Sequence, residues 1–309
     1  MNPGLTAPNR GGQPHTGGGA SILPKRTLKD QTGAVTVTTG GAQPPHARGG
    51  EPVSTRRIWA FRVLAGLAGC VFLVTLPQAI SPWGAVTLSN TSGVHDLNLH
   101  RWSAALAGGP DLGMAAVLLY LAWRPMKAPL VLQWLALAVL VFLAANVPFV
   151  GPTVALIAIP VVLVLAAYPD PRALLRPPWT DGVRLPVLAV GVLVAAFLLP
   201  DSVRALAAQV GGTDELARNY DAASNGEHMI SVSLAALLSG MRRPGAQVLT
   251  LMAAAVLTFL GAAAVTVPTN PGSWGIVGGA AAIAGGLALG AAAAYEWRRG
   301  RSNLAGNGG

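Results

Sequence analysis

The chain has 309 residues, of which 52% are hydrophobic and only 11% are charged. A soluble globular domain carries roughly 25% charged residues, so this composition excludes an ordinary soluble protein and favours one that lies in a lipid bilayer. The formal net charge of +9 would suit a nucleic-acid-binding protein. The basic residues, however, lie beside apolar segments and not along one soluble face, and we therefore expect no nucleic-acid partner.

Residues 1–55 are rich in glycine and proline and have no periodic apolar face. Such a segment cannot bury enough surface to offset the entropy lost on ordering, so we expect a disordered cytoplasmic tail. Residues 1–57 carry seven basic and two acidic side chains. This charge predicts attraction to anionic lipid headgroups, worth about 1 kcal/mol for each basic residue near the surface. A solvated leader without a partner is the other interpretation.

Eight apolar segments follow, each long enough to cross the ~30 Å hydrocarbon core as a helix. The first runs from about residue 58 to 80. The others lie at about 103–123, 128–147, 152–168, 184–200, 224–241, 245–267 and 274–296. We therefore predict an all-α, polytopic transmembrane helical bundle of about eight spans, embedded in the lipid bilayer.

The basic residues predict which side each connection faces. If both termini are cytoplasmic, 18 of the 21 lysines and arginines lie on the cytoplasmic side, and only Arg101, Arg204 and Arg218 lie outside. Short cytoplasmic loops retain positive charge, whereas translocated loops do not. The expected location is the bacterial plasma membrane, with both termini in the cytoplasm.

The connections on the outer side alternate between long and short, which suggests an internal duplication. Arg124 and Pro125 after the second span recur as Arg243 and Pro244 after the sixth. We predict two parallel four-helix repeats. The expected divisions are 1–55 for the tail, 56–176 and 177–301 for the repeats, and 302–309 for a disordered C-terminus.

The last predicted span carries small residues on one face, at Gly275, Gly279, Gly286 and Gly290. Small residues at such spacing allow another helix backbone to approach closely. The neighbouring helix belongs either to the same chain or to a second subunit or membrane protein partner, and the sequence leaves both open.

Two ionisable residues occupy similar depths in corresponding spans. Asp111 lies 13 residues from Arg124, and His228 lies 14 residues from Arg242. Both would then lie roughly 9–10 Å below the outer boundary of the core. Ionisable groups at such depth are costly unless they face a partner or a wet cavity. We therefore predict an outward-facing polar vestibule, lined by Asp111 and His228 with Asn225, Glu227, Ser231 and Ser233 nearby.

Another interpretation of these two residues is structural. Residues 108–110, with the sequence Gly-Gly-Pro, could break the second span, so that Asp111 caps a short helix. His228 could likewise lie at the level of the headgroups.

His95, Asp96 and His100 stand close together in the first outer connection. Two histidines and a carboxylate can hold a transition metal, with His228 as a further ligand. A solvated amphipathic segment is the other interpretation.

Short motifs resemble those of actinobacterial multi-pass membrane proteins that contain a DoxX-like four-helix unit, sometimes doubled. The motifs are residues 111–113, residues 123–125, His228 and residues 242–244, within a region of about 58–297. The chain also resembles the haem A synthases, which double a four-helix bundle and place paired histidines in the helices of each half. Here the first half has no histidine within a predicted span.

Two functional hypotheses follow. The first is a non-enzymatic membrane protein that binds, senses or transports a small solute through the vestibule, or that acts as a membrane scaffold; it assigns no catalytic residue and expects no cofactor. The alternative is a membrane-embedded metal- or haem-dependent redox enzyme that uses His95, His100 and His228.

Overall fold

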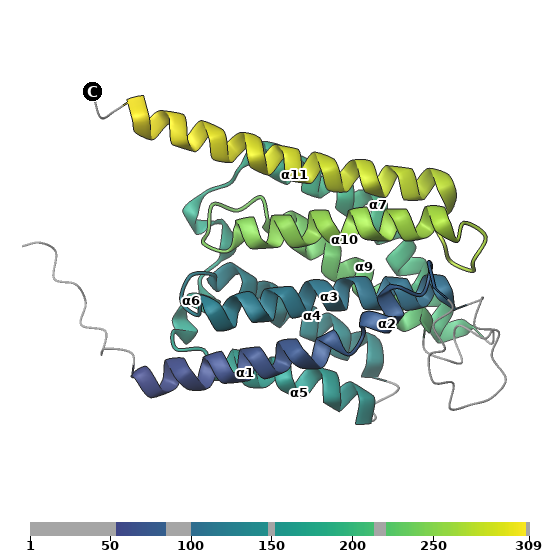
Figure 1. The fold of residues 1–309 in the computed structure, drawn as a ribbon, viewed down its shortest axis with the longest axis horizontal. Helices are drawn as coiled ribbons and strands as arrows, with labels where there is room; N and C mark the ends of the chain where they lie inside the picture. The colour runs from purple at the N-terminus through teal and green to yellow at the C-terminus, as the bar shows by residue number, and fades with distance from the viewer. Residues whose placement is uncertain (1–53, 85–99, 148–151, 213–220, 307–309) are drawn as a thin grey trace, which may run out of the picture. The chain divides into compact units, whose positions relative to one another are not determined.

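The computed structural model describes residues 54–84, 100–147, 152–212 and 221–306, and these residues form a bundle of helices (Figure 1). No β-strand forms within these ranges. The elements are α1 (Thr55–Leu73), α2 (Leu76–Ala79), α3 (Arg101–Trp123), α4 (Pro129–Asn146), α5 (Pro152–Ala167), α6 (Pro171–Leu175), the 3-10 helix η2 (Pro178–Asp181), α7 (Leu185–Gly211), α9 (Asp221–Leu238), α10 (Ala246–Thr266) and α11 (Gly275–Gly306).

Several helices begin at the signals that the local sequence provides. The Ser54 side chain accepts a hydrogen bond from the backbone N–H of Arg57 at the start of α1, and Asp170 does the same for Ala173 in α6. Proline lies in the first turn of α4 at Pro129 and of α7 at Pro186. Proline suits the first turn because the backbone N–H that it lacks would have no partner within the helix.

Each of the eight predicted spans coincides with a helix or contains most of one. Five of these helices, α3, α4, α7, α10 and α11, are long and apolar enough to cross a membrane. Of the other three, α5 is a shorter apolar helix, α1 carries three arginines, and α9 is polar in its first half. The chain is therefore an all-α protein with several candidate membrane helices, and the number eight remains a prediction.

The first and the fifth predicted spans end at other residues in the structure. The first predicted span, residues 58–80, is broken: α1 ends at Leu73, and after a turn the chain enters α2. Pro77 cannot donate a hydrogen bond to the carbonyl of Leu73, and the Thr75 hydroxyl instead bonds the carbonyl of Phe72 at 2.7 Å. In contrast, α7 continues through Pro200 to Gly211, where the sequence suggested an outer loop.

The C-terminal helix also extends beyond its predicted end at residue 296. α11 continues to Gly306, into the range 302–309 for which a disordered C-terminus was expected. Residues 307–309 lie outside the described ranges, as do residues 1–53 of the predicted tail at 1–55. Thr55, the last residue of that predicted tail, begins α1.

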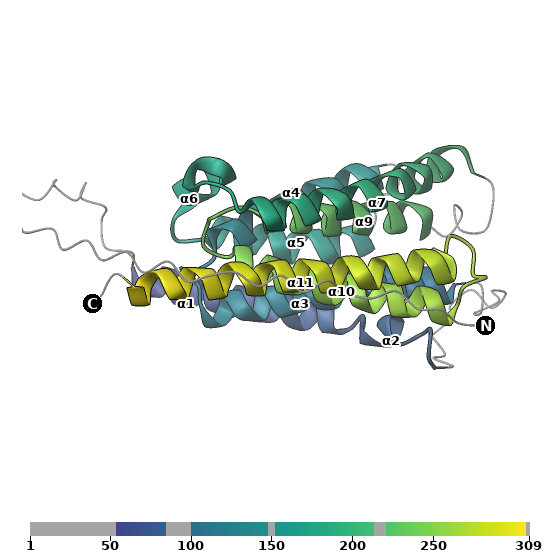
Figure 2. The ribbon, with the colours of Figure 1, turned by 90° about the horizontal axis from the view of Figure 1, so that it is seen from above.

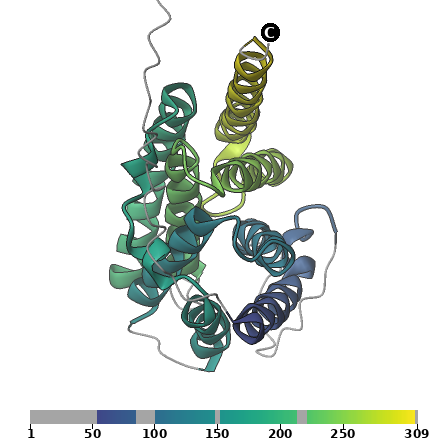
Figure 3. The ribbon, with the colours of Figure 1, turned by 90° about the vertical axis from the view of Figure 1, so that its left-hand side faces the viewer.

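Helices α3 and α9 share most of the interhelical packing. α3 contacts α1, α2, α9 and α10, and α9 contacts α3, α4, α7 and α10. The peripheral contacts are α4 with α5, α10 with α11, α1 with α5, and α7 with α11. Figures 2 and 3 show that these helices run along a common direction.

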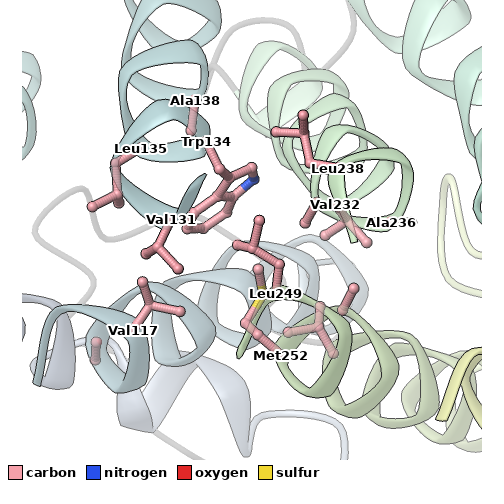
Figure 4. Packing of buried hydrophobic residues seen from close by; sticks show 14 of the residues in the cluster. Val117, Val131, Trp134, Leu135, Ala138, Val232, Ala236, Leu238, Leu249 and Met252 are labelled. Atoms are coloured by element: carbon pink, nitrogen blue, oxygen red, sulfur yellow. The ribbon is translucent and has the colours of Figure 1, made fainter. Parts of the chain in front are cut away.

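The central core lies where α3, α4, α9 and α10 meet (Figure 4). Trp134 of α4 is 2% exposed, and its indole N–H donates to the carbonyl of Ser231 on α9 at 2.9 Å. Val117 of α3, Val232 of α9 and Met252 of α10 are buried in the same cluster. This packing fixes the rotation of α9 relative to α3, and therefore determines which polar residues face each other.

The glycine face of α11 packs within the chain. A Cβ atom on Gly279 would lie 2.7 Å from the carbonyl oxygen of Gly261 on α10, and one on Gly286 would lie 2.7 Å from that of Ala254. The two backbones are therefore in close contact, as small residues permit. The partner helix of this face is α10 of the same chain.

Basic residues gather at one end of the bundle. α1 begins there, α11 ends there, and α6 lies there (Figure 1). We call this end the basic end and the opposite one the α2 end. The basic residues of the connections and helix termini at the basic end are Arg56, Arg57, Arg124, Lys127, Arg172, Arg176, Arg184, Arg242, Arg243, Arg298 and Arg299.

Arg243 is 4% exposed and joins elements of both halves at the basic end. Its guanidinium donates to Gln133 Oε1 of α4 at 3.0 Å and to the backbone carbonyls of Arg176 and Ala173. Burial lowers the pKa of Arg243, which Asp181 partly opposes. A buried guanidinium with three acceptors stabilises this end of the bundle, because N–H groups that burial removes from water need acceptors within the protein.

Candidate binding site between helices α3 and α9

Three polar pairs join α3 and α9, which both begin at the α2 end and run in the same direction. We call this contact the α3–α9 seam. From the α2 end inward, the pairs are His100 Nδ1 with Asp221 Oδ2 at 2.6 Å, Asn225 Nδ2 with Ser103 Oγ at 3.1 Å, and His228 Nε2 with Asp111 Oδ1 at 3.4 Å. The α9 members are four and three residues apart, which is the spacing that places side chains on one helix face.

The predicted meeting of Asp111 and His228 is therefore present. Each side chain is 13% exposed. His228 Nδ1 lies 2.7 Å from the backbone oxygen of Ser224, and a carbonyl can only accept a hydrogen bond. Nδ1 must consequently carry a hydrogen, and Nε2 is the nitrogen that gains or loses a proton opposite Asp111.

Helix α3 is continuous through residues 108–110, so the interpretation of Asp111 as the cap of a short helix is wrong. The glycines serve close packing: a Cβ atom on Gly108 would lie 2.4 Å from the backbone nitrogen of Ala79, and one on Gly109 would lie 2.7 Å from the Phe259 ring. Since α2 and α10 hold α3 from two sides, Pro110 interrupts the hydrogen-bond ladder without ending the helix.

Glu227 is the most deeply buried carboxylate of the cluster. The residue is 3% exposed, and its Oε1 lies 3.3 Å from His228 Nδ1. Its Oε2 is buried and has no hydrogen-bond partner within the described parts of the chain, and the same holds for Asn225 Oδ1. Leaving a buried acceptor without a donor lowers the stability of a fold by about 1–3 kcal/mol. A ligand that donates hydrogen bonds to these two acceptors would recover that free energy.

The other residues predicted near the vestibule take structural roles. Ser231 offers its backbone carbonyl to Trp134, and the Ser233 hydroxyl donates to the carbonyl of Met229 within α9 at 2.8 Å. Sequence reasoning missed Ser103, Ser224 and Asp221 as members of the seam. The four- and three-residue spacing of Asp221, Asn225 and His228 is a signal that could have found Asp221.

The predicted metal ligands do not come together in the described residues. His95 and Asp96 lie outside the described ranges, and His100 pairs with Asp221. Since His228 lies seven residues after Asp221, the two histidines are separated by about 10 Å along the seam. Among the described residues, no group of three or more His, Cys, Asp or Glu side chains could hold a metal ion.

Few other charged groups face the seam. Helices α4 and α10 contain no titratable residue, and the two charged residues of α7, Asp201 and Arg204, pair with each other. Arg101 at the start of α3 donates to the backbone oxygens of Ser81 and Pro82. Within the described ranges, no lysine or arginine forms an ion pair with Asp111 or Glu227.

Comparisons of the chain with protein-family models, with curated proteins and with solved structures find no match. The likeness to DoxX-like proteins consequently rests on the short motifs alone, and the likeness to haem A synthases rests on the predicted doubling of a four-helix unit alone. The function of the α3–α9 seam has to be argued from its geometry.

Proposed function

We propose that the chain is a multi-pass protein of the bacterial plasma membrane, with eight spans and both termini in the cytoplasm. The concentration of basic residues at one end of the bundle supports this orientation, because translocated connections rarely carry so many. The apolar helices support the location, and the N-terminal tail is proposed to bind anionic lipid headgroups through its positive charge. Association with a second copy or another membrane protein is compatible with the exposed apolar faces of these helices.

The bundle is proposed to consist of two four-helix repeats. Supporting this, the interhelical contacts are nearly unchanged when α1, α3, α4 and α5 are exchanged with α7, α9, α10 and α11, respectively. The exceptions are the contacts of α2 and α6 and the contact between α9 and α10. In this arrangement, α3 and α9 are equivalent helices that meet at the boundary between the repeats.

The function that the geometry supports best is non-enzymatic binding of a small polar solute at the α3–α9 seam, for sensing or transport. The observation that carries this proposal is the pair of Asp111 and His228, joined across two helices beside the buried Glu227. Ionisable groups inside a membrane bundle are costly, and functional need is their usual explanation. The solute would enter from the α2 end, where both helices begin.

The purified chain in nanodiscs provides the test, with glucose, acetate, glycine and methylammonium as one probe each of neutral, anionic, zwitterionic and cationic solutes. We expect at least one probe to raise the thermal unfolding midpoint of the wild-type protein, since a ligand that binds only the folded state stabilises it. Asp111→Asn and His228→Ala should abolish this shift, whereas Asp201→Asn, in the exposed pair on α7, should retain it. Equal shifts in all four proteins would contradict a site at the seam.

A further inference from the structure

When both carboxyl groups of the cluster formed by Asp111, Glu227 and His228 are ionised, the cluster lacks one positive charge, because even a fully protonated His228 compensates only one of them. Arg101 of α3 and Arg204 of α7 do not compensate the second carboxylate, since Arg101 bonds backbone oxygens and Arg204 pairs with Asp201. An uncompensated charge among apolar helices is costly, so a bound cation would stabilise the site.

The unsatisfied hydrogen-bonding groups of the seam are both acceptors. Glu227 Oε2 and Asn225 Oδ1 belong to residues that are 3% and 6% exposed, and neither has a donor within the described ranges. A ligand that satisfies both acceptors therefore donates hydrogen bonds, and a positive charge on it would compensate an ionised Glu227. Asp111 and His228 remain 13% exposed, so the cluster retains an edge that is open to solvent.

The arrangement favours an ammonium group over a metal ion. A metal ion requires several ligands around one centre, and the described residues offer no such group. A primary ammonium carries three N–H donors on rotatable bonds, and each donor can serve a separate acceptor. Its single charge equals the charge that the cluster lacks.

We propose that the α3–α9 seam binds a small organic ammonium cation, with Glu227 as its buried counter-ion and Asp111 at the solvent-accessible edge. This inference rests on the proposed solute-binding function and specifies the chemical class of the solute. His228 lies between the two carboxylates. Its protonated ring balances the negative charge of one carboxylate, and the ammonium ligand balances the negative charge of the other.

The experiment compares methylammonium, tetramethylammonium and sodium chloride at equal ionic strength, with the full chain in nanodiscs and the thermal unfolding midpoint as readout. Tetramethylammonium carries the same charge without an N–H donor, and sodium carries the charge without any hydrogen. We expect only methylammonium to raise the midpoint saturably. Glu227→Gln should weaken its apparent affinity about tenfold or more, since it removes a charged hydrogen bond, and Asp201→Asn should not change it.

Equal effects of the three salts on the wild-type protein would overturn the proposal, and this comparison needs no variant to fold. An unchanged methylammonium affinity in Glu227→Gln would overturn it as well. If methylammonium has no effect but Glu227→Gln removes a pH dependence of the midpoint, the missing charge is a proton and the proposal is wrong.

The neutral and anionic probes distinguish a failure of the ammonium assignment from a failure of the proposed solute-binding function. Binding of glucose or acetate that Asp111→Asn abolishes, without any response to methylammonium, would overturn the ammonium assignment and leave a solute site. If no probe responds to any substitution in the seam, both proposals fail.

Discussion

At the scale of single residues, two buried ionisable side chains differ in how many of their hydrogen-bonding atoms have partners. At the basic end, Arg243 is fully supplied with acceptors: Gln133 Oε1 and the carbonyls of Ala173 and Arg176. In the seam, Glu227 has one carboxylate oxygen for which the described part of the chain provides no donor. A satisfied buried group stabilises a fold, whereas an unsatisfied one indicates a site that is completed by something else.

Arg243→Ala should therefore lower the free energy of unfolding by about 2–4 kcal/mol, because it removes the charged hydrogen bonds from a buried guanidinium to Gln133 Oε1 and to the carbonyls of Ala173 and Arg176. Chemical unfolding in detergent, monitored by tryptophan fluorescence, measures this change. Arg242→Ala is the matched control: it removes the same charge at the adjacent, exposed position and should alter the unfolding free energy by less than about 0.5 kcal/mol. Similar losses in both variants would show that charge, and not the buried contacts, is responsible.

At the scale of elements, the helices are held together where small residues allow backbones to approach. The contact of α10 with α11 depends on Gly261, Gly279 and Gly286, and the contact of α7 with α9 brings Gly191 against the carbonyl of Ala236. In a lipid environment the hydrophobic effect does not drive one helix against another, so close packing of this kind carries the association.

Gly279→Ala is expected to destabilise the protein by about 1–3 kcal/mol, since the new methyl group would meet the Gly261 carbonyl at 2.7 Å and force α11 away from α10. Gly290→Ala, on the same helix, has its nearest neighbour at 4.0 Å and should be neutral or slightly stabilising. Thermal unfolding midpoints of the two variants provide the comparison. If Gly279→Ala were as stable as Gly290→Ala, the packing of α11 on α10 would be looser than described.

At the scale of the whole molecule, the basic residues define one end of the bundle, and the contacts among α1, α3, α4 and α5 resemble those among α7, α9, α10 and α11. In the proposed arrangement of two repeats, α3 and α9 would be equivalent helices, and the α3–α9 seam would lie between the repeats. Equivalent helices with different side chains can form a site that neither repeat contains alone.

The proposed orientation predicts opposite accessibility for two exposed positions. In a Cys70→Ala background, Val210→Cys lies at the end of α7 near the α2 end, and Leu175→Cys lies in α6 at the basic end; the native side chains are 88% and 85% exposed. A membrane-impermeant maleimide added to intact cells should label the former and not the latter, and both should react after lysis. Labelling of Leu175→Cys in intact cells would reverse the proposed topology.

Much of the bundle could be predicted from the sequence because apolar length and charge placement are local properties. The helical segments, the side with the basic residues and the similar depth of Asp111 and His228 all follow from counting along the chain. The alternative of a helix break at residues 108–110 was wrong because the continuity of α3 depends on contacts that are not local. Helices α2 and α10 pack against this segment and keep α3 helical, and the local sequence does not show that they are its neighbours.

The sequence by itself determined the helical class, the basic end and the similar axial position of Asp111 and His228, because each depends on hydropathy, charge or counting along the chain. Only the tertiary structure decided that Ser103 bonds Asn225, that Ser224 fixes the hydrogen on His228 Nδ1, and that Glu227 is buried with an oxygen that has no partner among the described residues. These features depend on how far each helix is rotated about its axis. That rotation is set by side-chain packing among α3, α4, α9 and α10, which involves residues far apart in the chain.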